Sequence, residues 1–148
     1  AAGGQVKKAD NSHIGIANEI EINKNGIKHP LYKNKDKKFN SPAFNFDEVV
    51  KIPDKGICLA SNKINKVQGL YFEVNKTKIW GLQYHPEITY EKMINLIEFR
   101  KERLIESRKV FKDDTEVQKH IAFIKKEISV SDKEKRMLEL KNWLNELN

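Results

Sequence analysis

A histidine and a glutamate stand two positions apart at the end of an apolar run. The stretch reads WGLQYHPE, residues 80–87, and it places Pro86 between His85 and Glu87. Side chains two residues apart on an extended chain leave the same face. A carboxylate beside an imidazole holds the ring in one tautomer and stabilises its protonated form. The spacing therefore predicts a base-and-orienter pair of the kind that a nucleophilic thiol requires. A surface turn of the same three residues is the alternative.

The elements that must position this pair read as strands. The run IWGLQYHP, residues 79–86, is continuously apolar in its first half, which predicts a strand buried on both faces and terminated by Pro86. The stretches DEVVKIP, GICLASN and VQGLYFEV predict three more strands before it.

The earlier part of the chain shows a second pattern. Isoleucines alternate at four even positions, which predicts one half-buried strand over residues 14–22. The sequence NKNG that follows, residues 23–26, predicts a hairpin turn. The stretches HPLY and KNKDKK, residues 29–38, predict an exposed loop.

From Thr89 onward the apolar spacing changes to that of helices, and three amphipathic helices are expected. We expect them to pack on one another or on the sheet; docking of a partner is the alternative for their apolar stripes. Ser131 and Glu134 form a capping-box pair at the start of the third. The predicted stripes are Met93, Ile97, Leu104 and Ile105; Val117, Ile121, Ile124 and Ile128; and Met137, Leu140, Trp143, Leu144 and Leu147.

The heptapeptide GLQYHPE, residues 81–87, resembles the second catalytic motif of class I glutamine amidotransferases, position by position. Two upstream segments resemble the same family in the right order. DEVVKIPDKGICLASN is similar to the stretch before the last strands, and AAGGQVKKADNSHIGIANEIEI is similar to the segment after the nucleophile. By pattern, the amidotransferase module of the GMP synthase type is the nearest, and the resemblance covers about residues 1–90.

The resemblance implies an α/β protein with a partial flavodoxin-like class I amidotransferase fold, comprising the later strands of the central sheet, followed by a three-helix extension. It divides the chain into residues 1–90, the C-terminal part of the amidotransferase domain, and residues 91–148, a helical extension of the same domain. The later strands are expected to be antiparallel and in part connected by hairpins.

The resemblance also implies a mechanism. A Cys-His-Glu triad would hydrolyse the side-chain amide of glutamine and release ammonia for transfer, with His85 and Glu87 as catalytic residues. No metal or organic cofactor is expected; a synthase partner or water would accept the ammonia. Phe44 and Asn45 are the candidate substrate-binding residues. Many relatives carry a histidine at the position of Asn45.

The nucleophile of this family lies at a Gly-x-Cys-x-Gly elbow, which the resemblance places before AAGG and outside this chain. The chain alone is therefore expected to be inactive. Cys58 lacks flanking glycines and reads as a buried structural cysteine. Two other functions remain open: a non-catalytic interaction module, or pseudoenzyme, and a γ-glutamyl hydrolase-like peptidase.

The amino-acid composition limits the classes of protein to which the chain can belong. The chain has 148 residues, one cysteine, a net charge of +7 and a pI of about 9.4. One cysteine excludes a disulfide within the chain, and the compartment is expected to be cytoplasmic. No apolar window is long enough for a membrane span. The lysines are scattered among glutamates and asparagines, so nucleic-acid binding is not expected. His13, His29 and His120 are expected to be structural or solvent-facing.

Overall fold

The computed structural model describes residues 2–147, so the first residue of the AAGG segment and the last residue of the helical extension lie outside the described residues. In chain order the strands and α-helices are β1 (Gln5–Ile14), β2 (Ala17–Ile22), α1 (Lys24–Lys28), β3 (Lys38–Ser41), β4 (Phe44–Lys51), β5 (Ile57–Ser61), β6 (Gly69–Val74), β7 (Thr77–Leu82), α2 (Tyr90–Phe99), α3 (Asp114–Val130), α4 (Lys133–Arg136) and α5 (Leu138–Asn145). Two further helical turns are a 3₁₀ turn at Pro30–Tyr32 and a π turn at Arg103–Ser107. Apart from α1 and the 3₁₀ turn, which lie between β2 and β3, the strands precede the helices, as the sequence predicts.

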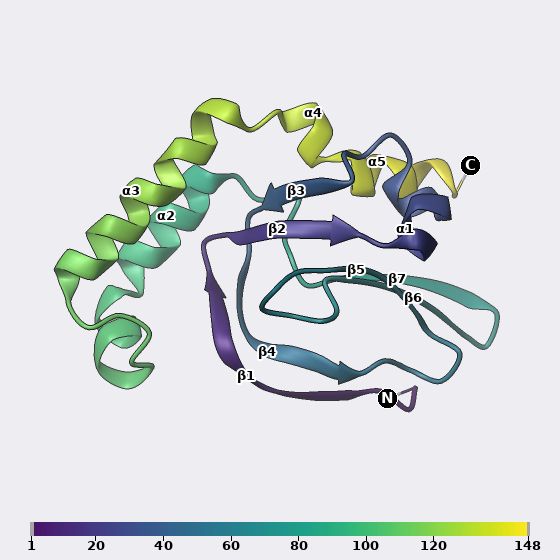
Figure 1. The fold of residues 1–148 in the computed structure, drawn as a ribbon, viewed down its shortest axis with the longest axis horizontal. Coiled ribbons are helices and arrows are strands. Elements are labelled where there is room, and N and C mark those ends of the chain that lie inside the picture. The colour runs from purple at the N-terminus through teal and green to yellow at the C-terminus, as the bar shows by residue number, and fades with distance from the viewer. Residues whose placement is uncertain (1, 148) are drawn as a thin grey trace.

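The strands form two antiparallel sheets (Figure 1). The larger has the order β3-β2-β5-β6-β7, and the smaller pairs β1 with β4. The prediction that the last strand is buried on both faces is wrong. Among the described strands β7 pairs with β6 alone, and none of its residues is fully buried. It lies at a sheet edge, where one long side of the strand has no second strand to pair with among the described residues.

The strand predicted over residues 14–22 is divided at Gly15. Its φ of +84° breaks the extended chain, so that β1 ends and β2 begins on either side. An added Cβ at Gly15 would lie 2.5 Å from Cδ1 of Ile124 and 2.8 Å from Cδ1 of Ile97. A residue that tolerates positive φ and has no side chain is required here. The break sends the isoleucines of β1 and β2 into two separate core clusters.

The hairpin turn predicted at residues 23–26 is also wrong. Asn23 begins the short helix α1 instead, because its side-chain oxygen accepts hydrogen bonds from the backbone N–H groups of Asn25 and Gly26. Gly26 lies so close to β5 that an added Cβ would be 2.2 Å from the carbonyl oxygen of Leu59. Helix capping therefore takes precedence over the Asn-Gly turn signal, and the chain continues into the 3₁₀ turn.

Helices α2 and α3 lie side by side (Figure 1). The first predicted helix is realised as α2 followed by the π turn, and the second as α3. Their apolar stripes cover one core cluster, which consists of Ile14, Ile16, Tyr90, Ile97, Leu104, Phe111, Val117, Ile121 and Ile124. The two helices therefore cover the junction where β1 of the smaller sheet passes into β2 of the larger one.

The third predicted helix differs from its expected form. It is interrupted at Met137 and gives α4 and α5. Of its apolar stripe, Met137 and Leu140 are partly buried and the later residues are exposed. Trp143, Leu144 and Leu147 are 43%, 53% and 65% exposed, whereas Glu139 and Asn142 are buried. Polar hydrogen bonds to the rest of the protein orient this segment in place of apolar packing. None of the helices within residues 2–147 is long and apolar enough to cross a bilayer.

Candidate functional site

His85 and Glu87 are brought together by a turn. Strand β7 ends two residues before Tyr84, and the N–H of Ile88 donates to the carbonyl of His85 across 3.1 Å. Residues 85–88 thus form a β-turn with Pro86 at its second position, where the fixed φ of proline is favoured. The side chains of His85 and Glu87 meet as expected, but the backbone between them forms a turn and is not extended, so that part of the prediction is wrong. We call residues 84–88 the corner.

The imidazole of His85 lies against the carboxylate of Glu87. Nδ1 and Oε1 are 2.8 Å apart, and the two side chains are 42% and 47% exposed. A carboxylate accepts hydrogen bonds, so a neutral imidazole in this contact carries its proton on Nδ1. Nε2 then keeps its lone pair, and among residues 2–147 no hydrogen bond occupies it. The pair can accept and return a proton at Nε2.

Strand β4 and the loop before it hold one side of the corner. The N–H of His85 donates to the carbonyl of Pro42 across 2.7 Å. Asn45 donates through Nδ2 to both the carbonyl and the side-chain oxygen of Gln83, at 3.0 and 2.8 Å. The structure therefore brings Asn45 to the residues that lead into His85. Its side-chain amide fixes the end of β7.

Phe44, the other residue predicted to bind substrate, has different surroundings. Its ring packs edge-on against Phe46, with centroids 5.8 Å apart, at the margin of the core cluster under α2. The guanidinium of Arg100 stands 5.3 Å from the Phe44 ring centroid. Phe44 and Asn45 are neighbours in a strand and point to opposite faces. The structure therefore does not group Phe44 with the His85–Glu87 pair.

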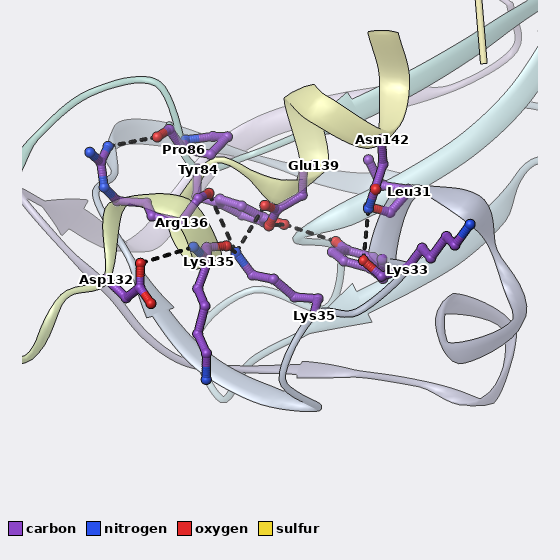
Figure 2. Close-up of polar contacts among 11 residues, drawn as sticks. Leu31, Lys33, Lys35, Tyr84, Pro86, Asp132, Lys135, Arg136, Glu139 and Asn142 are labelled. Atoms are coloured by element: carbon purple, nitrogen blue, oxygen red, sulfur yellow. Dashed lines mark hydrogen bonds and ion pairs between the residues drawn. The ribbon is translucent and has the colours of Figure 1, made fainter. Parts of the chain in front are cut away.

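A buried polar network lies directly behind the corner (Figure 2). The hydroxyl of Tyr84 donates to Oε1 of Glu139 across 2.7 Å, and Nζ of Lys35 lies 2.9 Å from the other oxygen. Burial lowers the pKa of Lys35, and the Glu139 carboxylate opposes that shift without reversing it. Burial also raises the pKa of Tyr84 well above its ordinary range, so its hydroxyl stays protonated and donates.

The sequence does not predict this network. Lys35 falls in a stretch expected to be an exposed loop, yet its side chain is only 4% exposed. The available signal is a polar repeat within the third predicted helix: Arg136, Glu139 and Asn142 recur every third residue. Residues three apart share a helix face, so a polar buried face competes with the apolar stripe.

Cys58 lies on β5, where its thiol contacts the backbone carbonyls of Ala60 and Lys66. Burial raises the pKa of this thiol, which is the opposite of what an activated nucleophile needs. Over the described part of the chain, no group of three or more His, Cys, Asp or Glu side chains is arranged to hold a metal ion.

The chain resembles two curated proteins in sequence. A γ-glutamyl-L-1-hydroxyisopropylamide hydrolase from Pseudomonas is 32% identical over 93 residues, which are 60% of this chain and 31% of that protein. One of the subunits of the glutamine-hydrolyzing GMP synthase from Methanocaldococcus jannaschii is 33% identical over 98 residues, which are 66% of this chain and 48% of that protein. The chain thus spans about a third to a half of the length of these relatives. No family model matches it.

The fold has solved counterparts. A glutamine amidotransferase from Thermotoga maritima superposes with a TM-score of 0.65 at 18% identity, over 98% of this chain and 55% of that one. The relatives and structural neighbours are therefore glutamine amidotransferases and related hydrolases. The curled antiparallel sheet and its helices match the fold of about half of that amidotransferase chain.

Proposed function

We propose that this part of a class I glutamine amidotransferase domain supplies the general base and its orienting carboxylate for hydrolysis of the glutamine side-chain amide. The observation that carries the proposal is the 2.8 Å contact between Nδ1 of His85 and Oε1 of Glu87. It lies in a turn held by β4, within a chain whose relatives include enzymes named for cleaving glutamine or a γ-glutamyl amide. The same contact in a protein without such relatives would be ordinary.

The chemistry assigned to the pair has two stages. His85 takes the proton of a cysteine thiol at Nε2, and the thiolate attacks the carboxamide carbon. His85 then gives that proton to the departing ammonia, which leaves a thioester. Water then attacks the thioester, His85 takes its proton, and the thiolate leaves with glutamate released. Glu87 keeps the imidazole in the tautomer with Nε2 free. We place the thiolate outside residues 1–148, because the surroundings of Cys58 disfavour ionisation.

Testing the proposal requires the whole product of the gene, including any coding sequence upstream of residue 1. That sequence is expected to contain a Gly-x-Cys-x-Gly segment. The purified product should release ammonia from L-glutamine, and His85→Ala should reduce kcat by about 10²- to 10⁴-fold, the range for loss of a general acid–base. His29→Ala is the matched control, since His29 lies at the end of α1. Ammonia release that survives His85→Ala would sink the assignment.

Substrate binding forms a finer part of the proposal. We assign Asn45, near the start of β4, to the residues that cradle the γ-glutamyl group, on the support of its two bonds to Gln83. Asn45→Ala is expected to raise KM and to lower kcat less. The assignment of Phe44 to substrate rests on the family resemblance, and Phe44→Leu tests it by the same KM readout.

A γ-glutamylamide hydrolase is the second candidate, favoured by the similarity to the Pseudomonas hydrolase. The two functions share every step up to the leaving group and differ in the amine released. Comparing kcat/KM for L-glutamine with that for γ-glutamyl amides of small alkylamines separates them. A preference for the substituted amides would select the hydrolase, with water as the only acceptor.

A non-catalytic interaction module is the remaining alternative. It would follow if the whole gene product has no nucleophilic cysteine and no amidase activity. For the amidotransferase, we further propose a cytoplasmic location and a synthase partner that accepts ammonia. Copurification of an acceptor enzyme whose ammonia-dependent step becomes glutamine-dependent would test that partner. We treat residues 1–90 and the helical residues 91–148 as one functional unit, because Arg136 of the helical part bonds to the corner.

A further inference from the structure

Arg136, in the helical part of the chain, reaches the turn that carries His85 (Figure 2). Its Nη1 donates to the carbonyl of Pro86 across 2.7 Å and to that of Ile88 across 2.6 Å. These two carbonyls belong to the residues immediately before and after Glu87. A charged donor binding neutral carbonyls makes stronger hydrogen bonds than a neutral donor does. Arg136 therefore fixes the 86–87 and 88–89 peptide groups, which lie on either side of the 87–88 peptide group.

The same segment holds the residue before His85. Glu139 is fully buried and accepts from the hydroxyl of Tyr84, which is itself 2% exposed. Arg136 and Glu139 lie three positions apart, so one face of the segment contacts both neighbours of His85. Tyr84 is held through its side chain, and Pro86 through its carbonyl.

The segment is itself anchored to the body of the protein. Nδ2 of Asn142 donates to the carbonyls of Leu31 and Lys33, both at 2.9 Å. Asp132 caps the start of α4 by accepting from the backbone N–H groups of Glu134 and Lys135. Arg136 thus extends from a backbone fixed at both ends. We call Arg136, Glu139 and Asn142 the C-terminal clamp.

The His85–Glu87 contact needs such support. Both side chains are nearly half exposed, and exposed ion pairs in water hold their geometry weakly. Within the turn, one backbone hydrogen bond, from Ile88 to His85, closes the loop. The guanidinium of Arg136 adds two more bonds to the same turn without touching either functional side chain. Its route to the pair therefore runs through the backbone.

We propose that Arg136 is a positioning residue for the His85–Glu87 pair, acting through the carbonyls of Pro86 and Ile88. This inference rests on the proposed function, because positioning has a catalytic meaning only if His85 is the base. Misplacement of a catalytic group by about 1 Å costs roughly 10²-fold in rate. Loss of Arg136 should therefore lower kcat by about that factor and leave KM almost unchanged.

The first experiment needs no activity. Residues 1–148 are prepared with ¹⁵N-labelled histidine, and the His85 nitrogen shifts are recorded at pH 8, with Glu87→Gln to mark the signature of a broken contact. Wild type should show the Nδ1–H tautomer. Arg136→Met should move His85 toward the mixture seen in Glu87→Gln, whereas Lys133→Met, which removes a positive charge from the same helix, should not.

The tautomer measurement on Arg136→Met is meaningful only if the variant is folded, which amide hydrogen exchange tests. Slow amide exchange in α2 and α3 must persist in Arg136→Met, since the core cluster that these helices cover contains no clamp residue. Arg136→Lys is the second variant: it keeps the charge but not the planar guanidinium, so partial recovery of the Nδ1–H tautomer is expected. A wild-type His85 spectrum in a folded Arg136→Met chain would overturn the proposal.

Kinetics on the whole gene product separates the two proposals. If wild type hydrolyses glutamine and His85→Ala does not, an unchanged kcat in Arg136→Met refutes the positioning role alone. If wild type is inactive while Arg136→Met still shifts the His85 tautomer, the proposed function fails and the structural effect of Arg136 stands. A fall of about 10²-fold in kcat with KM retained supports both.

Discussion

The hydroxyl of Tyr84 and the carboxylate of Glu139 share a 2.7 Å hydrogen bond although 55 positions separate them in the sequence. Neither side chain is more than 2% exposed. Lys35 completes the arrangement at 2.9 Å from the same carboxylate. A buried charge is tolerated only when it is paired and hydrogen-bonded, and here three elements supply the partners. The bond joins the helical segment to the residue that precedes His85.

Glu139→Ala is expected to lower the free energy of unfolding by about 3–5 kcal/mol, because it leaves the ammonium of Lys35 buried without its partner. Urea denaturation of residues 1–148 measures the loss. Adding Lys35→Met should restore part of it by removing the unpaired charge. Glu134→Ala is the matched control: Glu134 lies in the same segment, pairs with Lys141 and is 74% exposed. Equal losses in the two glutamate variants would contradict the buried pair.

Cys58→Ser is expected to leave amide hydrolysis by the whole gene product within about twofold of wild type. The reason is that burial raises the pKa of this thiol, which keeps it in the unreactive protonated form at neutral pH. Reaction of residues 1–148 with a thiol reagent at pH 7 should accordingly be slow until the chain is unfolded. Abolished hydrolysis in a folded Cys58→Ser protein would make Cys58 the nucleophile.

Stability is expected to fall as the pH drops below about 6.5, the ordinary pKa of histidine. His13 is 2% exposed, and burial lowers its pKa in the folded state. Between the folded and unfolded pKa values the unfolded chain binds the extra proton, so stability rises with pH in that window and is lost as pH falls. One such group contributes a slope of up to about 1.4 kcal/mol per pH unit.

Comparison with His13→Gln isolates the contribution of His13. The pKa of His29 is also lowered by burial and acts in the same direction, so it must be left in place. The variant should lose part of the pH dependence between about pH 5 and 7. Parallel stability curves for wild type and variant would refute the assignment to His13.

Gly15→Ala is expected to cost roughly 2–4 kcal/mol, from a strained positive φ and from overpacking. The added methyl group would meet Cδ1 of Ile124 and Cδ1 of Ile97. Ile124→Val removes one of these two methyl groups, so the double variant should lose less than the sum of the two single variants. Strict additivity in thermal or urea unfolding would show that α3 does not pack on Gly15.

The parts of the fold that the sequence predicts are those governed by local pattern. Apolar pattern identifies the last four strands, from the stretch that begins at Asp47, and the helices α2 and α3. The motif at residues 81–87 identifies the candidate pair. The two-residue spacing predicts the contact between His85 and Glu87, and the structure reaches it through a turn that Pro86 favours. The spacing of the two residues thus predicts that their side chains meet, but it does not predict the backbone conformation between them.

The elements that differ from their predictions depend on distant partners. The Asn-Gly signal at residues 23–26 gives way to a helix cap because β5 lies against Gly26. Lys35 reads as exposed until its partner Glu139, more than a hundred positions away, is in place. The apolar stripe through Trp143 stays at the surface because the polar clamp fixes the rotation of its helix. The periodicity of a short segment cannot predict polar pairs between residues that lie far apart in the sequence.

The anchoring of the turn by Arg136 has a consequence for the order of events during protein synthesis. Arg136 lies 50 positions after Pro86, so the ribosome translates all of α2 and α3 before the guanidinium exists to bind that carbonyl. Contacts of such large sequence separation close slowly, because loop entropy opposes them. The sheet can pair as the chain emerges, while the arrangement around His85 is completed late. The sheet would therefore form before the turn that carries His85 is fixed.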